Sequence, residues 1–238
     1  MADKKVVLFI VEGANDQIAL AKSLDNLLSS ESVNFQITEG DITGDKQGKG
    51  IKAKVGDVIR QHCMQYKLKS ADILETVLLL DMDGAYIAPD KILYSSDHSK
   101  PFYKEDTLLT GNPNALYETH LGKQRNLNIL IGTEEVMNIP FSVYFFSCNL
   151  DHVICNDANL AQSQKREEAG RFENKYYKNS TGFLAFFQGK EIASESSYPE
   201  SWKTIKEDTN SLKRRSNLNI FLSLDAKCIP RDFSHLND

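Results

Sequence analysis

Apolar residues gather in short runs along the chain, and more polar segments separate these runs. A short uninterrupted apolar run is typical of a buried strand. The runs that predict strands lie at 5–11, 33–38, 76–80, 128–131 and 141–147. After Asp16 and over about 51–67, apolar residues recur at helical spacing instead. Strands that alternate with helices predict an α/β fold, in which helices cover both faces of a parallel or mixed sheet.

Two stretches depart from this alternation. A segment rich in Gly and Pro follows the third predicted strand, and it predicts an insertion or a rim over 84–125. Later in the chain, polar helical patterns surround one short apolar helix that Ser180 or Thr181 would cap. We therefore predict a core at 1–157 and a mostly helical elaboration, packed on that core, at 158–238.

The composition is ordinary for a globular protein, with 41% hydrophobic and 26% charged residues. The longest apolar runs are far shorter than the roughly 20 residues of a membrane-spanning helix, and the first residues lack a signal-peptide cleavage pattern. The four cysteines form no Cys-x-x-Cys pair and the five histidines are scattered, so neither a zinc site nor a disulfide framework is expected. These features predict a cytoplasmic protein without a membrane partner.

The net charge of -5 gives the whole chain no general attraction for nucleic acid. One segment, from Lys46 to Lys69, is strongly basic and contains the single acid Asp57. Its cations are Lys46, Lys49, Lys52, Lys54, Arg60, Lys67 and Lys69. Two interpretations are open: a solvated loop and helix face, or a local patch that contacts phosphates.

Acidic residues follow two of the predicted strands. Glu12 comes directly after the first apolar run and Asp16 follows it, while Asp81 and Asp83 come after the third. Functional groups collect at the carboxyl ends of strands in open α/β sheets, so neighbouring strands would crowd these carboxylates together. Like charges at close range require a cation, and carboxylate oxygens suit Mg²⁺ or Mn²⁺. The alternative is that each is a solvated acid at a strand end.

The segments "FIVEGANDQIAL" and "LLLDMDG" together resemble the two acidic motifs of Toprim domains, in the same order and context. The resemblance covers about residues 5–90 and extends at most to 157. It implies a small Rossmann-like core with a mainly parallel sheet. It also implies that Glu12 is an acid/base or metal ligand, that Gly13 allows a phosphate to approach, and that Asp81 and Asp83 bind Mg²⁺ while Asp16 completes or orients a second metal site.

A third segment, "PFSVYFFSCNLDHVICND", is similar in position to one that carries an acidic residue in stand-alone Toprim nucleases of bacterial defence systems, the overcoming-lysogenization-defect and RloB-like groups. Asp151 is the candidate metal ligand there, with Asn149 as the second choice. Those groups usually have Glu at this place. The alternative for Asp151 is that it caps the helix that follows the strand.

The resemblance implies a Mg²⁺- or Mn²⁺-dependent nuclease that cleaves DNA or RNA, tRNA included. Its candidate substrate-binding residues are Gly13, Lys49, Lys52, Lys54, Lys100 and Lys104. The segment "GDKQGKGIK" does not match a phosphate-binding loop, so the chain itself is not expected to be an ATPase. The resemblance implies an effector of an anti-phage defence system that a partner, commonly an ATPase, holds in check. The apolar segment at 182–187 belongs either to the core or to a homo-oligomer interface.

Two other functions remain open. The same carboxylates would serve a Toprim-like adaptor that binds nucleic acid without cutting it. In addition, "LLLDMDGA" alone is similar to the first motif of haloacid-dehalogenase-like phosphatases, with Asp81 as nucleophile and Asp83 as general acid. That class also needs a Ser or Thr at a strand end, a Lys and a late acidic pair. The late segment "NIFLSLDAKC", which we predict as a strand, offers only Asp225, and the phosphatase interpretation leaves Glu12 without a role.

Overall fold

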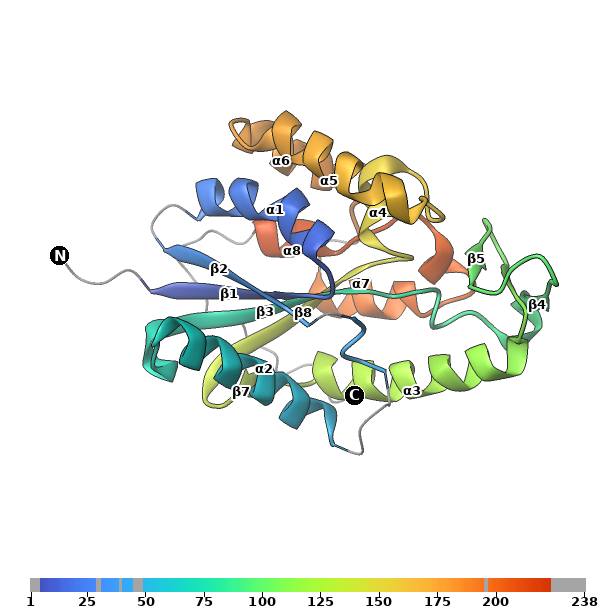
Figure 1. Cartoon of the computed structure of the whole chain (residues 1–238), viewed down its shortest axis with the longest axis horizontal. Helices are drawn as coiled ribbons and strands as arrows, with labels where there is room; N and C mark the ends of the chain where they lie inside the picture. The colour runs from blue at the N-terminus through green and yellow to red at the C-terminus, as the bar shows by residue number, and fades with distance from the viewer. Residues whose placement is uncertain (1–4, 29–30, 39, 45–48, 195–196, 224–238) are drawn as a thin grey trace.

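A five-stranded sheet forms the centre of the protein (Figure 1). The computed structural model describes residues 5–28, 31–38, 40–44, 49–194 and 197–223. In spatial order, the strands are β2 (Ser32–Ile37), β1 (Val6–Val11), β3 (Ile73–Asp81), β8 (Ile139–Phe146) and β7 (Glu135–Val136). The first four are parallel to their neighbours, and only the short β7 is antiparallel. The predicted Rossmann-like α/β fold with a mainly parallel sheet is therefore confirmed.

The three central strands are buried on both faces, which explains their unbroken apolar sequences. Successive side chains of a strand point to opposite faces, so Phe9 and Val11 of β1 lie in one core cluster while Leu8 and Ile10 lie in another. The same alternation holds in β3 and β8. Each of these strands consequently needs helices on both sides.

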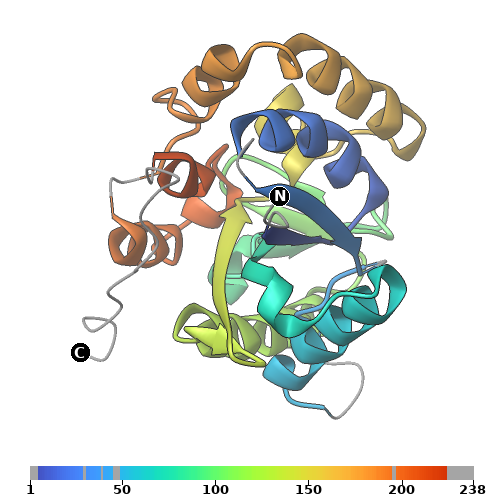
Figure 2. The ribbon, with the colours of Figure 1, turned by 90° about the vertical axis from the view of Figure 1, so that its left-hand side faces the viewer.

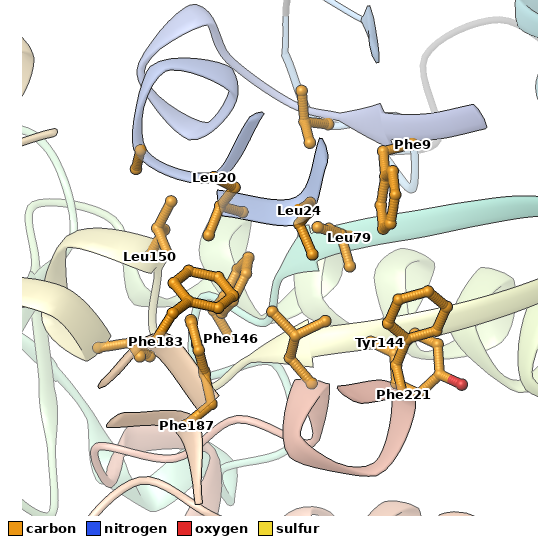
Figure 3. Close-up of a cluster of buried hydrophobic side chains, with 14 of the residues drawn as sticks. Phe9, Leu20, Leu24, Leu79, Tyr144, Phe146, Leu150, Phe183, Phe187 and Phe221 are labelled. Carbon is orange, nitrogen blue, oxygen red and sulfur yellow. The ribbon is translucent and has the colours of Figure 1, made fainter. Parts of the chain in front are cut away.

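Four helices cover the first face. They are α1 (Ala14–Leu27), α5 (Gln162–Tyr176), α6 (Ser180–Phe187) and α8 (Leu218–Ser223). Figure 3 shows how Leu20 and Leu24 of α1 meet the strand residues, with Phe183, Phe187 and Phe221 below them. Helices α5 and α6 lie outside α1 and form a further layer (Figure 1). The apolar segment at 182–187 is thus largely core, with Phe183 and Phe187 fully buried.

Three helices cover the opposite face (Figure 2). They are α2 (Ile51–Tyr66), α3 (Pro113–Ile131) and α7 (Tyr198–Ile205). Ile51, Val55 and Ile59 of α2 are buried, as their helical spacing predicts. No helix in the described part of the chain is long and apolar enough to cross a membrane.

The segment between β3 and α3 forms a small second sheet. Its strands, in spatial order, are β4 (Ile92–Tyr94), β6 (Leu108–Thr110) and β5 (Phe102–Tyr103). This sheet lies beyond the carboxyl end of the central sheet, at the far end of the molecule from the N-terminus (Figure 1). The short helix α4 (Leu150–Cys155) follows β8 at the same end.

Three local predictions were wrong. Residues 128–131 form the end of helix α3, because Leu127 and Leu130 are buried at helical spacing and a short apolar run fits either element. The apolar part of "NIFLSLDAKC" is helix α8, and its Asp225 lies outside the described residues. Helix α6 is capped by Asn179, whose side chain accepts a hydrogen bond from the Gly182 N–H at 2.9 Å.

Candidate active site

The two acidic clusters meet at one edge of the sheet. β1 and β3 are adjacent and parallel, so Glu12 and Asp81 leave neighbouring strands at their carboxyl ends. Asp16 lies in the first turn of α1, and Asp83 follows β3 by two residues. The charges of Glu12, Asp16 and Asp83 each raise the pKa of Asp81. The structure therefore brings together the four acids that the sequence singled out.

Burial is the main influence on the titration of Glu12. Burial raises its pKa well above the usual value, the Lys123 charge opposes that rise, and the neighbouring carboxylates add to it. Its Oε1 atom is buried and accepts no hydrogen bond from any described residue. A buried carboxylate oxygen without a donor is unfavourable unless a proton or a cation satisfies it.

Asp81 and Asp16 are each held by a backbone N–H group. Asp81 Oδ1 accepts a hydrogen bond from the Leu150 N–H at 3.0 Å, and Asp16 Oδ2 accepts one from the Gly13 N–H at 2.9 Å. Burial raises the pKa of Asp81 well above its usual value, and the charges of Asp16 and Glu12 raise it further. Burial also raises the pKa of Asp16, to about 6. Both carboxylates are thus poised to take up a proton or a cation.

Asp83 is held by two side chains. Its Oδ2 atom lies 2.6 Å from Lys123 Nζ, and its Oδ1 atom accepts a hydrogen bond of 3.1 Å from the Tyr103 hydroxyl. Its backbone has a left-handed φ of 52°, which Asp tolerates better than most residues, and its N–H donates to the Cys148 carbonyl at 2.9 Å. This turn fixes where the carboxylate points.

Lys123 is a fully buried cation in the middle of the acids. Besides Asp83, it contacts Asp41 at 3.4 Å, and the Glu12 charge also acts on it. Burial lowers the pKa of Lys123, but the three carboxylates outweigh this effect and raise it, so the side chain stays charged. Burial acts against ionisation of Asp41 as well. There, the Lys123 charge and the hydrogen bonds from Thr43 outweigh it and hold the pKa of Asp41 below its usual value.

Asp151 forms the other side of the site. It is buried on α4, and its Oδ2 atom lies 2.6 Å from Lys165 Nζ on α5. Its charge acts on Asp16, which places it beside the acidic cluster. The alternative that Asp151 caps α4 is wrong, because Asn149 is the cap and its Oδ1 accepts from the His152 N–H at 2.8 Å.

A cavity of about 520 Å³ opens beside these carboxylates. Asp81 and Asp83 line one side, Lys165 lines another, and the small sheet contributes Lys100 and Tyr103. Its volume lies within the range of roughly 300–1,000 Å³ that is common for small-molecule sites. Asp81 and Asp83 are therefore accessible from a cavity large enough for a nucleotide, whereas Glu12 and Asp16 do not line it.

The other predicted substrate-binding residues lie in different settings. Lys104 is exposed and does not line this cavity. On α2, Lys52 is exposed and Lys54 donates to the Gly44 carbonyl at 2.8 Å. Lys49 precedes α2 and pairs with Asp57 at 3.0 Å. Lys46 lies outside the described residues.

Gly13 precedes α1 in an extended conformation (φ −139°) that any residue adopts, and a Cβ there would have only Asp16 Oδ2 nearby, at 3.6 Å. The glycine is therefore not required by the turn itself. What it provides is open space next to Asp16.

The residues fit a divalent cation only in part as they stand. Within the described ranges, no three His, Cys, Asp or Glu side chains are arranged to hold a metal ion, and protein donors occupy oxygens of Asp16, Asp81 and Asp83. Two features nevertheless suit a hard cation. Glu12 Oε1 is buried without a donor, and the surrounding carboxylates raise one another's pKa.

Several residues of this site were missed from the sequence: Asp41, Tyr103, Lys123 and Lys165. Lys123 lies in the segment predicted as a rim, next to a run mistaken for a strand. One signal was available for Asp41, which belongs to the Gly-rich segment that follows the second strand. Comparison of the chain with protein-family models, curated proteins and solved structures gives no match.

Proposed function

We propose that this chain is a Mg²⁺- or Mn²⁺-dependent nuclease of the Toprim type. The observation that carries the proposal is the buried Glu12 Oε1 without a donor, next to the carboxylates that leave the neighbouring strand. This combination is what a phosphodiester-cleaving site with a divalent cation requires, and it matches the roles that the Toprim resemblance assigns to Glu12, Asp81 and Asp83.

Glu12, Asp16 and Asp81 would hold the cation, with Asp83 beside them and Asp151 at the edge. A divalent cation supplies Lewis-acid activation of the phosphoryl group and neutralises its charge. The engagement of Asp83 and Asp41 by Lys123 leaves fewer carboxylates for metal ions, so we infer that Lys123 replaces part of the positive charge of a two-metal site.

The protein groups have separate tasks in this scheme. Burial raises the pKa of Glu12 well above its usual value, which suits a group that exchanges a proton with the reacting oxygens. Lys123 keeps the Asp83 carboxylate in place. Lys165 and Lys100 line the cavity and can contact the phosphate charge.

The substrate is DNA or RNA, with tRNA as one candidate. By the same resemblance, the protein would act as an effector of a bacterial anti-phage defence system that a partner ATPase holds in check. This context is the least direct part of the proposal, since it depends on the resemblance alone.

Cleavage of plasmid, linear duplex, single strands and total tRNA with Mg²⁺ or Mn²⁺ tests the nuclease function. Glu12→Gln and Asp81→Asn should each lower turnover by at least a hundredfold, whereas Asp25→Asn, which changes an exposed acid on α1, should leave it unchanged. If the purified protein cuts no substrate but binds nucleic acid equally well with and without Glu12→Gln, the adaptor function replaces the nuclease.

One contact favours a phosphatase as a second candidate. Lys123 pairs with Asp83, and a lysine near the acidic motif is one requirement of the haloacid-dehalogenase-like class. However, Ser147 at the end of β8 is fully buried and its hydroxyl donates to the Lys213 carbonyl, away from a substrate role. A phosphatase would release phosphate from p-nitrophenyl phosphate, lose this activity in Asp81→Asn and keep it in Glu12→Gln.

A further inference from the structure

The cavity beside the acids has an aromatic wall that the metal chemistry does not use. The rings of His98 and Phe102 both belong to its lining and are stacked on each other, with centroids 4.4 Å apart and an angle of 20° between the ring planes. Both residues are half-buried, so part of each side chain remains accessible. A flat ring pair next to a phosphate-binding site is a surface on which a nucleic-acid base can stack.

The wall is fixed in place by hydrogen bonds. Asn159 holds Tyr103 on both sides of its backbone: its Oδ1 accepts from the Tyr103 N–H at 2.8 Å, and its Nδ2 donates to the Tyr103 carbonyl at 2.8 Å. The Tyr103 hydroxyl in turn donates to Asp83. The strand that carries Phe102 is therefore tied both to the loop before α5 and to the acidic site.

The charges around the cavity indicate how a nucleotide would lie. Asp81 and Asp83 mark the end where a metal-associated phosphate would sit, and Lys100 and Lys165 provide positive charge on the lining. A base that is paired and stacked in a continuous duplex has no free face to offer, so it would have to leave the helix to enter.

We propose that this cavity binds one unpaired nucleotide next to the scissile phosphate, with its base stacked on the His98–Phe102 pair. The substrate class is then single-stranded nucleic acid, including loops and frayed ends, and not continuous duplex. This inference rests on the proposed nuclease function for the position of the phosphate, but base binding can be measured without cleavage.

The test measures binding of a labelled single-stranded 12-mer and of the matching blunt duplex by fluorescence anisotropy. All proteins carry Glu12→Gln and are kept in Mg²⁺, so that turnover does not interfere. Phe102→Leu keeps an apolar side chain but removes the ring, and it should weaken single-strand binding about tenfold. Tyr94→Ala, which removes a 70% exposed ring of the same small sheet that does not line the cavity, should have no effect.

Equal affinity for duplex and single strand, or unchanged binding in Phe102→Leu, would overturn the inference. If Phe102→Leu does not fold, His98→Ala removes the other ring of the pair at a position that does not belong to β5, and it should weaken single-strand binding in the same way. Cleavage assays of the protein with native Glu12 separate the two proposals. Equal cleavage of duplex and single strand would leave the nuclease function standing without this specificity. Ring-dependent binding of single strands without any cleavage would support the base site and reject the nuclease.

Discussion

Lys123 is the residue on which the charge balance of the acidic site depends. It is 1% exposed and contacts the partly exposed carboxylates of Asp83 and Asp41, so its removal would leave these charges and the neighbouring buried Glu12 without a cation. Breaking a buried ion pair in this way is typically destabilising by about 3–5 kcal/mol. We expect Lys123→Met to lower the free energy of unfolding by an amount in this range, as measured by urea denaturation in the absence of metal.

Two further variants separate charge from packing in that experiment. Lys203→Met removes an equally long cation that is 69% exposed and lies 4.0 Å from Glu200, and it should change stability by less than about 1 kcal/mol. Adding Asp83→Asn to Lys123→Met should recover part of the lost stability, because one unpaired charge disappears. A double variant as unstable as the sum of the two single changes would argue against an electrostatic origin.

His120 provides a pH-dependent signal from the same region. It is buried on α3, where burial lowers its pKa to about 4, although the Asp83 charge acts in the opposite direction. Because the folded pKa lies below the unfolded value, His120 contributes full stability above about pH 6.5 and loses it as the pH falls towards 4. The difference in unfolding free energy between wild type and His120→Gln should change by roughly 2–3 kcal/mol across this window. Carboxylates titrate in both wild type and His120→Gln, so their contribution cancels in the difference. A difference in unfolding free energy that stays constant with pH would refute the role of His120.

The sequence predicted some residues of the site and not others for a physical reason. Glu12, Asp81 and Asp83 follow apolar runs, and a strand's end is visible in the sequence. The positions of Lys123 and Asp41 depend on how a helix and a loop pack against those strands. Tertiary contacts determine that placement, and they produce no periodic pattern in the local sequence that could reveal it.

At the scale of elements, the central strands were predictable because burial on both faces makes them continuously apolar. The end of α3 was not, because a four-residue apolar run at 128–131 is too short to distinguish a helix from a strand. The small sheet was also not predicted, since its strands are only two or three residues long. Short elements of this kind are determined by their surroundings more than by their own sequence.

The turn after β3 is the element that orients Asp83, and Gly84 is essential to it. Gly84 has a φ of +68°, and a Cβ there would lie 2.7 Å from Leu212 Cδ2. We expect Gly84→Ala to destabilise the protein by about 2 kcal/mol and to impair cleavage as well, measured by thermal melts and by turnover. Gly170→Ala is the matched control, because this helical glycine on α5 has nothing within 4 Å of the added Cβ. It should stabilise by about 0.5–1 kcal/mol and leave turnover intact.

At the scale of the whole molecule, the site is assembled from segments far apart in the chain. The first strand and helix, the third strand, and helices α3, α4 and α5 each contribute a charged group. Such a site is formed only when both faces of the sheet are covered. Repulsion between its carboxylates therefore destabilises the whole folded state, and a bound cation would reduce this repulsion.

Because of this repulsion, we expect Asp81→Asn to have opposite effects on thermal stability with and without a bound cation. Without metal, Asp81→Asn should raise the melting temperature, because it removes a buried charge whose pKa its neighbours already raise. A cation at a hundredfold excess over its dissociation constant should stabilise the wild type by about 2.7 kcal/mol, or roughly 5–10 °C. Asp81→Asn should lose most of this gain, Asp57→Asn should keep it, and EDTA should reverse it. If Mn²⁺ shifts wild type and Asp81→Asn equally, the cation binds elsewhere and the acids are structural.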